Sequence, residues 1–153
     1  MRGILIVTHG HLAPELLDSA RTILGRELQN VRALSLAWTE GWDEARSKIA
    51  LEIGAFPPGT EGILVLTDLH GDTPSRAAAS FQEPGRVEVI TGVNLPMVVR
   101  LGCADQEDLP LAELARWIEV KGRRAIRRAE PRSAEEERAR AATATDPSKG
   151  ECE

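Results

Sequence analysis

Four short apolar runs lie in the first two thirds of the chain, and each is followed by a segment with a different spacing of apolar positions. The runs cover residues 3–7, 31–36, 63–66 and 87–91. The first and third consist of consecutive aliphatic residues without alternation, which indicates strands buried on both faces, as in parallel sheets. The pattern therefore predicts four strands, two of them fully buried.

The segments that follow these runs have the apolar spacing of amphipathic helices. The first stripe ends at Gly25, a typical residue beyond a helix end, and the second has to end before Pro57. Thr73 followed by Pro74 is typical of a helix start, with the threonine as N-cap. Helices are therefore predicted over 12–24 and 42–56, from Thr73 onward, in a short stretch after 95, and from Leu111 onward.

The end of the last predicted helix allows two structures. An interruption is expected near Gly122, and the basic residues 123–128 either extend the helix or form a short edge strand. Beyond Pro131 the apolar pattern disappears, so we expect residues 131–153 to be a disordered polar tail.

Repeated strand-then-helix units predict an α/β fold with right-handed crossovers. We expect a three-layer sandwich with a mainly parallel central sheet, and the edge-strand alternative at 123–128 would add an antiparallel C-terminal strand. A chain of 153 residues fits one domain, which we assign to residues 1–130.

Composition narrows the range of functions. The net charge of −5, the lack of Tyr and an aromatic content of 3% argue against a general nucleic-acid binder. The N-terminus lacks the pattern of a secretory signal, and no apolar run is long enough to cross a bilayer. No Gly-x-Gly-x-x-Gly fingerprint follows the first strand. We therefore expect a cytoplasmic protein without a cofactor, a nucleic-acid partner or direct membrane insertion.

The chemistry of parallel α/β sheets gathers beyond the carboxyl ends of the strands. His9 and Asp68 each follow a buried run and a threonine, so both are expected at this edge, close to residues 92–97. A carboxylate that accepts the proton of one imidazole nitrogen leaves the other nitrogen as a nucleophile. Asp68 is therefore expected to orient His9 for attack.

A transferred phosphoryl group also needs hydrogen-bond donors near the nucleophile. The helix that begins at Thr73 offers backbone N–H groups and a hydroxyl group, while Gly10 and Gly71 allow the backbone to approach closely. The sequence thus predicts a phosphoryl carrier in which His9 and Asp68 are catalytic. Thr73, Gly10 and Gly71 are the expected phosphoryl-binding residues.

Three segments together resemble the IIA component of the mannose/fructose/sorbose family of the bacterial phosphotransferase system. They read GILIVTHGHLAPELL (3–17), GILVLTDLHGDTPS (62–75) and VEVITGVNLPM (87–97). Their order and spacing match the family pattern, and the resemblance covers residues 1–130. Three matched segments are far more specific than any one of them.

The resemblance implies a role for each matched residue. His9 would be transiently phosphorylated on a ring nitrogen, receiving the group from the phosphocarrier protein HPr and passing it to a IIB domain. Asp68 would orient that histidine, and Thr73 would help to hold the phosphoryl group. Because only a short tail follows residue 130, we expect the IIB acceptor to be a separate chain. Family members are typically homodimers, and some exchange a C-terminal edge strand, which would fall near Ile126.

The second segment departs from the family pattern at three positions. Asp72 stands where a glycine is common, His70 where an aromatic residue is common, and Arg76 where an asparagine is often found. If Asp72 faces the site, it repels phosphate by on the order of 1 kcal/mol even with strong water screening. If it faces solvent, it merely fits the turn. We expect these three residues to modulate transfer.

Two other functions stay open. One is a non-catalytic regulatory or binding module of the same fold, which the charge of Asp72 favours. The other is a metal-binding or chelatase-like protein that uses His9 and His11 with His70 and Asp72. Because positions 9 and 11 point in different directions on entering a helix, we assign no metal ligand. Trp38 follows the second strand near the same edge, and either packing or partner contact is expected for it.

Overall fold

The computed structural model describes residues 1–103, 109–129 and 138. In this part of the chain, strands and helices alternate as far as the fourth strand, and two helices follow it. The strands are β1 (Gly3–His9), β2 (Val31–Leu36), β3 (Ile63–Thr67) and β4 (Val87–Thr91). The helices are α1 (Leu12–Leu24), α2 (Trp42–Gly54), α3 (Thr73–Ala79), α4 (Leu95–Cys103) and α5 (Leu111–Ala125).

The four strands are parallel and lie in the order β2-β1-β3-β4. The strand order reverses between β1 and β3, and this switch point is where ligands of open α/β sheets bind. In the register of the sheet, Val7 pairs with Thr67 and His9 pairs with Leu36. The carboxyl ends of β1 and β3 therefore lie side by side.

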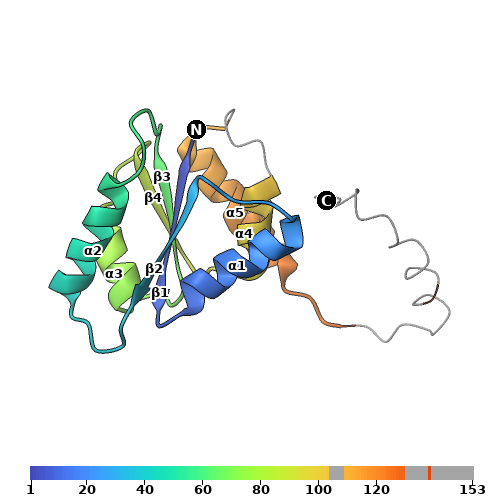
Figure 1. The fold of residues 1–153 in the computed structure, drawn as a ribbon, viewed down its shortest axis with the longest axis horizontal. Coiled ribbons are helices and arrows are strands. Elements are labelled where there is room, and N and C mark those ends of the chain that lie inside the picture. Colours follow the sequence, from blue (N-terminus) through green and yellow to red (C-terminus); the bar gives the residue numbers. More distant parts are fainter. Residues whose placement is uncertain (104–108, 130–137, 139–153) are drawn as a thin grey trace.

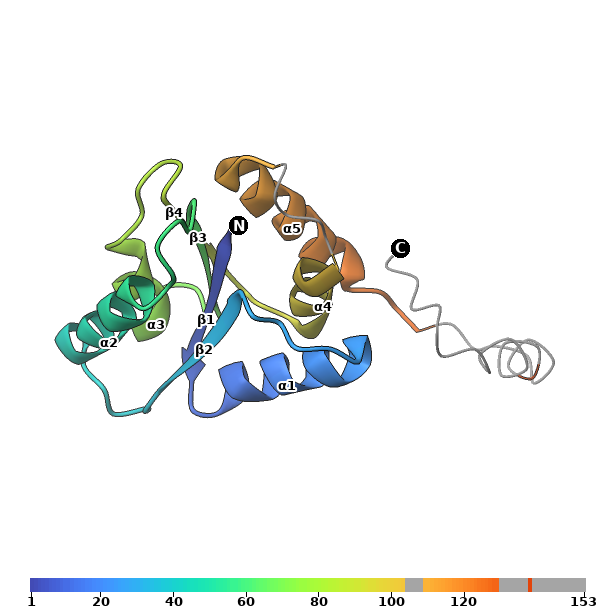
Figure 2. The ribbon, with the colours of Figure 1, turned by 45° about the horizontal axis from the view of Figure 1, so that its top comes forward.

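Helices cover both faces of the sheet. In Figure 1, α2 and α3 lie on one face and α1, α4 and α5 on the other, and the rotated view in Figure 2 keeps this division. Ile4 and Ile6 belong to the core under α1, α4 and α5, whereas Leu5 and Val7 belong to the core under α2 and α3. Burial on both faces explains why the first apolar run does not alternate. The predicted three-layer α/β sandwich is confirmed.

The first half of the basic segment, residues 123–125, continues α5, whereas residues 126–128 form neither helix nor strand. The helix runs to Ala125, and residues 126–129 belong to no regular element. Within the described residues, the sheet consists of its four parallel strands and includes no antiparallel C-terminal strand. The interruption expected at Gly122 is wrong, because the small residue packs against Met97 on α4.

Two element ends differ from the sequence prediction. Helix α2 ends at Gly54, because Phe56 leaves the helix and packs its ring against the sheet, where it lies over Gly3. Helix α3 is capped by Asp72 and not by Thr73, which is the first helical residue. The tail expected at 131–153 lies outside the described residues, Arg138 excepted. Among the residues that the structure describes, no helix is long and apolar enough to span a bilayer.

Candidate functional site

His9 is the last residue of β1, and one carboxylate holds it at two points. The ring nitrogen Nδ1 lies 2.9 Å from Oδ2 of Asp68, and the backbone N–H of His9 donates to the same oxygen over 2.9 Å. Asp68 follows β3 directly, so the adjacent ends of β1 and β3 bring the two residues together. The contact assigns the proton of the neutral ring to Nδ1, which leaves the lone pair on Nε2.

The Asp68 carboxylate is partly buried but stays charged. Burial alone would raise the pKa of Asp68, whereas hydrogen bonds from the His9 backbone, the His9 ring and the Leu69 backbone lower it. The hydrogen bonds outweigh burial, so the pKa of Asp68 lies below the usual value for an aspartate. An ionised Asp68 at neutral pH is able to stabilise positive charge on the imidazole.

Trp38 covers one face of the His9 ring. The ring centroids are 4.6 Å apart and the ring planes differ by 12°, so the two rings are stacked. Trp38 is 78% exposed, whereas His9 is 8% exposed, so the indole lies between the imidazole and solvent. Sequence reasoning placed Trp38 near this edge but missed the stacking. The pairing of His9 with Leu36, which ends β2 two positions before Trp38, brings the two rings together.

The second ring nitrogen of His9 faces another carboxylate. Oδ2 of Asp72 lies 3.4 Å from Nε2, and the Asp72 side chain is 46% exposed. Its other oxygen accepts a hydrogen bond from the Thr73 backbone N–H over 2.8 Å. The sequence left open whether Asp72 faces the site or solvent, and the structure turns its carboxylate toward Nε2.

Gly10 lies in the loop between β1 and α1, and Gly71 lies in the loop between β3 and α3. Both have positive φ angles, 54° and 84°, in the left-handed region that favours glycine. The N–H of Gly10 donates to the Leu36 carbonyl over 2.8 Å, and the N–H of Gly71 donates to the Ser75 hydroxyl over 2.9 Å. Both N–H groups are therefore engaged in hydrogen bonds within the fold. Sequence reasoning did not single out Ser75, which holds this loop.

The other titratable residues that the sequence singled out are exposed. His70 lies with its Nδ1 3.3 Å from the Thr91 hydroxyl. His11 precedes α1 without capping it through its side chain, and Arg76 lies on the open side of α3. Across residues 1–103, 109–129 and 138, no group of three or more His, Cys, Asp or Glu side chains is placed to hold a metal ion.

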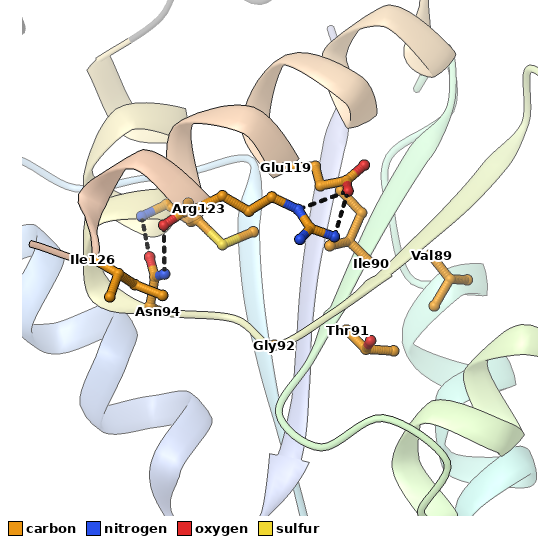
Figure 3. A pocket seen from close by; sticks show the side chains of 10 residues that line it. Val89, Ile90, Thr91, Gly92, Asn94, Glu119, Arg123 and Ile126 are labelled. Carbon is orange, nitrogen blue, oxygen red and sulfur yellow. Dashed lines mark hydrogen bonds and ion pairs between the residues drawn. The ribbon is translucent and has the colours of Figure 1, made fainter.

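A pocket of about 400 Å³ lies between β4 and α5 (Figure 3). Ile90 and Thr91 of β4 line one side of it, and Glu119 and Arg123 of α5 form an ion pair of 3.0 Å on the other. Figure 3 shows Ile126 just beyond the end of α5, beside the same pocket. Thr91 also contacts His70, so the pocket adjoins the loop that carries Asp72.

The fold and the site together define a class of protein. It is a three-layer α/β protein in which a carboxylate orients a histidine at the switch point of a parallel sheet. Residues 3–117 match the family described as the PTS system fructose IIA component. The chain therefore belongs to the mannose/fructose-type IIA family of the phosphotransferase system, as the three sequence segments predicted.

Individual relatives agree with this family. The PTS system mannose-specific EIIAB component of Escherichia coli (strain K12) is 32% identical over 126 residues, which are 82% of this chain and 38% of that protein. The chain thus spans 38% of the length of this relative. The PTS system fructose-specific EIIA component of Bacillus subtilis (strain 168) is 33% identical over 115 residues, covering 74% of this chain and 77% of the relative.

A solved structure shares the same arrangement of helices and strands. The mannose/sorbose specific IIA subunit of the phosphotransferase system from Enterococcus faecalis has a TM-score of 0.76 at 26% identity. The likeness covers 86% of this chain and 97% of that chain. The described part of this chain therefore has the fold of a IIA component over nearly the full length of that subunit.

Proposed function

We propose that this protein is a phosphohistidine carrier of a sugar phosphotransferase system. His9 accepts a phosphoryl group from HPr and passes it to a mannose-type IIB protein. The observation that carries the proposal is the contact between Nδ1 of His9 and Asp68, which leaves Nε2 as the nucleophile at the switch point of the sheet. Membership of the IIA family supports the same reaction.

Each matched residue has a chemical task in this proposal. The lone pair of Nε2 forms a bond to phosphorus while the bond between phosphorus and the donor atom of HPr breaks and leaves its electron pair on the donor. The ring becomes positively charged, and the ionised Asp68 carboxylate at Nδ1 stabilises that charge. Thr73 contributes its hydroxyl group to the phosphoryl oxygens, and Gly10 and Gly71 let these oxygens approach the backbone.

The proposal includes a homodimer that works in the cytoplasm, where HPr and IIB proteins act. Two features support the dimer. Strand β4 is an edge of the sheet that the described residues form, and edge strands carry unpaired backbone groups that favour pairing with another chain. The adjacent pocket is lined by Ile90 and by Ile126, whose side chain is 80% exposed.

The test is phosphorylation of each histidine variant. Wild type, His9→Ala, His11→Ala and His70→Ala are incubated with enzyme I, HPr and phosphoenolpyruvate, and the intact mass is measured under alkaline conditions that preserve phosphohistidine. We expect one acid-labile phosphate on wild type and on the variants at His11 and His70, and none on His9→Ala. The two control variants remove the same group from exposed positions next to the site.

Two results would overturn the proposal that His9 is a phosphoryl carrier. Phosphate on His9→Ala would show that another residue accepts the phosphoryl group. An unlabelled wild type beside a labelled control IIA component would favour the second candidate, a regulatory module without transfer. The position of the Asp72 carboxylate at Nε2 is the observation that favours that candidate.

A further inference from the structure

The His9 ring has a carboxylate at both of its nitrogens. Asp68 approaches Nδ1 to 2.9 Å and Asp72 approaches Nε2 to 3.4 Å. Asp68 orients the ring, whereas Asp72 faces Nε2, the nitrogen that would bond to phosphorus. A phosphoryl group bonded to Nε2 would have to lie on the same side of the ring as the Asp72 carboxylate. The chain thus places one of its own anions where a transferred anion would sit.

The backbone around Asp72 is held in place. Its carbonyl oxygen accepts hydrogen bonds from the Ser75 hydroxyl over 2.9 Å and from the Arg76 backbone N–H over 2.9 Å. The Ser75 hydroxyl also accepts from the N–H of Gly71, which ties the preceding residue to α3. With the loop fixed at these points, Asp72 leaves Nε2 by rotation of its side chain. That side chain is 46% exposed, so it has solvent to turn into.

Rotation of Asp72 also breaks a second contact. Its Oδ1 accepts from the backbone N–H of Thr73, and no Lys or Arg within the described residues forms an ion pair with it. When the carboxylate turns away, this N–H becomes available to another acceptor. An incoming phosphoryl oxygen is such an acceptor, so one anion replaces the other at the same donor.

We propose that Asp72 competes with the phosphoryl group for the position at Nε2 and thereby sets the equilibrium of transfer. The inference rests on the proposed function and deepens it. In the unphosphorylated state the carboxylate lies at Nε2, and it turns into solvent as the N–P bond forms and the bond to the donor breaks. Even when it is turned into solvent, the Asp72 carboxylate keeps its negative charge close to the phosphoryl group, and this repulsion makes phosphorylated His9 harder to form and a stronger phosphoryl donor. The protein therefore needs a more highly phosphorylated donor pool to reach the same phosphorylated fraction.

The test measures the equilibrium constant of phosphoryl transfer between HPr and this protein. Phosphorylated HPr is mixed with wild type, Asp72→Asn or Asp72→Gly, and the phosphorylated fractions are read by intact mass at alkaline pH. Asp72→Asn keeps the shape and removes the charge, while Asp72→Gly removes the side chain. Asp18→Asn is the matched control, because it makes the same charge change on the exposed face of α1.

We expect both Asp72 variants to shift the equilibrium toward the phosphorylated protein by roughly five- to tenfold, because charge repulsion on the order of 1 kcal/mol is removed, with Asp18→Asn equal to wild type. A second readout needs no phosphate. The ¹⁵N chemical shift of Nε2 in His9 should move in Asp72→Asn relative to wild type, and it should not move in Asp18→Asn.

The possible failures are distinguishable. Equal equilibrium constants for wild type and both Asp72 variants would overturn this inference and leave the phosphoryl carrier intact. An unchanged Nε2 shift in Asp72→Asn would overturn it as well, since the carboxylate would then not lie at that nitrogen in solution. If neither wild type nor any variant accepts phosphate, the carrier function itself fails and this inference fails with it.

Discussion

His9 contacts three side chains that come from two loops, with Asp68 and Asp72 in the loop between β3 and α3 and Trp38 in the loop between β2 and α2. Asp68 at Nδ1 was predictable, because two buried runs that both end in a threonine and a polar residue place those residues at one edge of a parallel sheet. The orientation of Asp72 and the stacking of Trp38 were not predictable from the pattern. Both depend on how short loops leave the sheet, and that course is determined by backbone contacts and not by apolar spacing.

The contact between Asp68 and Nδ1 of His9 predicts how Asp68→Asn changes the rate of phosphorylation by HPr. In Asp68→Asn the amide can donate to Nδ1, which would favour the tautomer with its proton on Nε2 and remove the nucleophilic lone pair. We expect the rate of phosphorylation by HPr to fall by on the order of 10²- to 10⁴-fold, as for other catalytic histidines that lose their orienting carboxylate. Stopped-time mass measurements give the rate, and a rate within a few-fold of wild type would contradict the role of Asp68.

The lowered pKa of Asp68 also makes the stability of the fold depend on pH. Because the pKa is lower in the folded than in the unfolded chain, the ionised carboxylate stabilises the fold above the ordinary aspartate value of about 4, and this stabilisation is lost as the pH falls through the lowered value. Urea unfolding should show wild type more stable than Asp68→Asn at pH 7, by about 1–3 kcal/mol. The difference should shrink toward acid pH, and a difference that grows there would contradict this account.

At the scale of elements, apolar periodicity was sufficient to locate the strands and helices but not all of their ends. It could not decide between helix and strand at 123–128, since basic residues around Ala125 and Ile126 suit an exposed face of either. The structure continues α5 to Ala125, where the helix remains in contact with α4 through Gly122. Packing of α5 against α4, and not the local spacing of apolar residues, therefore determines that the helix continues to Ala125.

Close contact between α1 and α4 depends on Gly102. A Cβ at this position would lie 2.5 Å from Cδ1 of Leu24 and 2.9 Å from Cδ2 of Leu28, in the core between the helices. Overpacking of this kind costs about 1–3 kcal/mol, which exceeds the gain of up to about 1 kcal/mol from replacing a helical glycine. We expect Gly102→Ala to lower the free energy of unfolding by roughly 1 kcal/mol in a urea titration.

Gly54 at the end of α2 provides the matched control. A Cβ added there meets nothing within 4 Å. Gly54→Ala should therefore raise the free energy of unfolding, by about 0.4–1 kcal/mol, through a smaller entropy of the unfolded chain. If the two substitutions changed the free energy of unfolding equally, close packing at Gly102 would not be what excludes a larger residue there.

At the scale of the whole molecule, the repeated strand–helix units predicted the layers and the parallel sheet, whereas the strand order had to come from the structure. Periodicity says which residues are buried but not which strand lies beside which. The order β2-β1-β3-β4 puts the two fully buried strands at the centre, which agrees with their apolar sequences. It also leaves β4 at an edge, next to the pocket under α5.

The edge position of β4 supports the prediction of a homodimer. Light scattering after size exclusion should give twice the chain mass of 16.6 kDa at micromolar concentration. Ile126→Asp, which places a charge at the pocket beside β4, should shift the protein toward monomer. Ile23→Asp is the control, since Ile23 is a comparably exposed isoleucine on α1, at 60% exposure. A monomeric wild type, or equal effects of the two variants, would contradict a dimer across this edge.

The central claim is that His9 carries phosphate on Nε2 because Asp68 holds Nδ1. The most direct measurement is a long-range ¹H–¹⁵N correlation spectrum of protein labelled with ¹⁵N-histidine, recorded at alkaline pH before and after phosphorylation by HPr. The account predicts that the Nε2 resonance of His9 alone moves to the position of a phosphorylated nitrogen, with His11 and His70 unchanged. Phosphate on Nδ1 of His9, or on either of the other histidines, would contradict it.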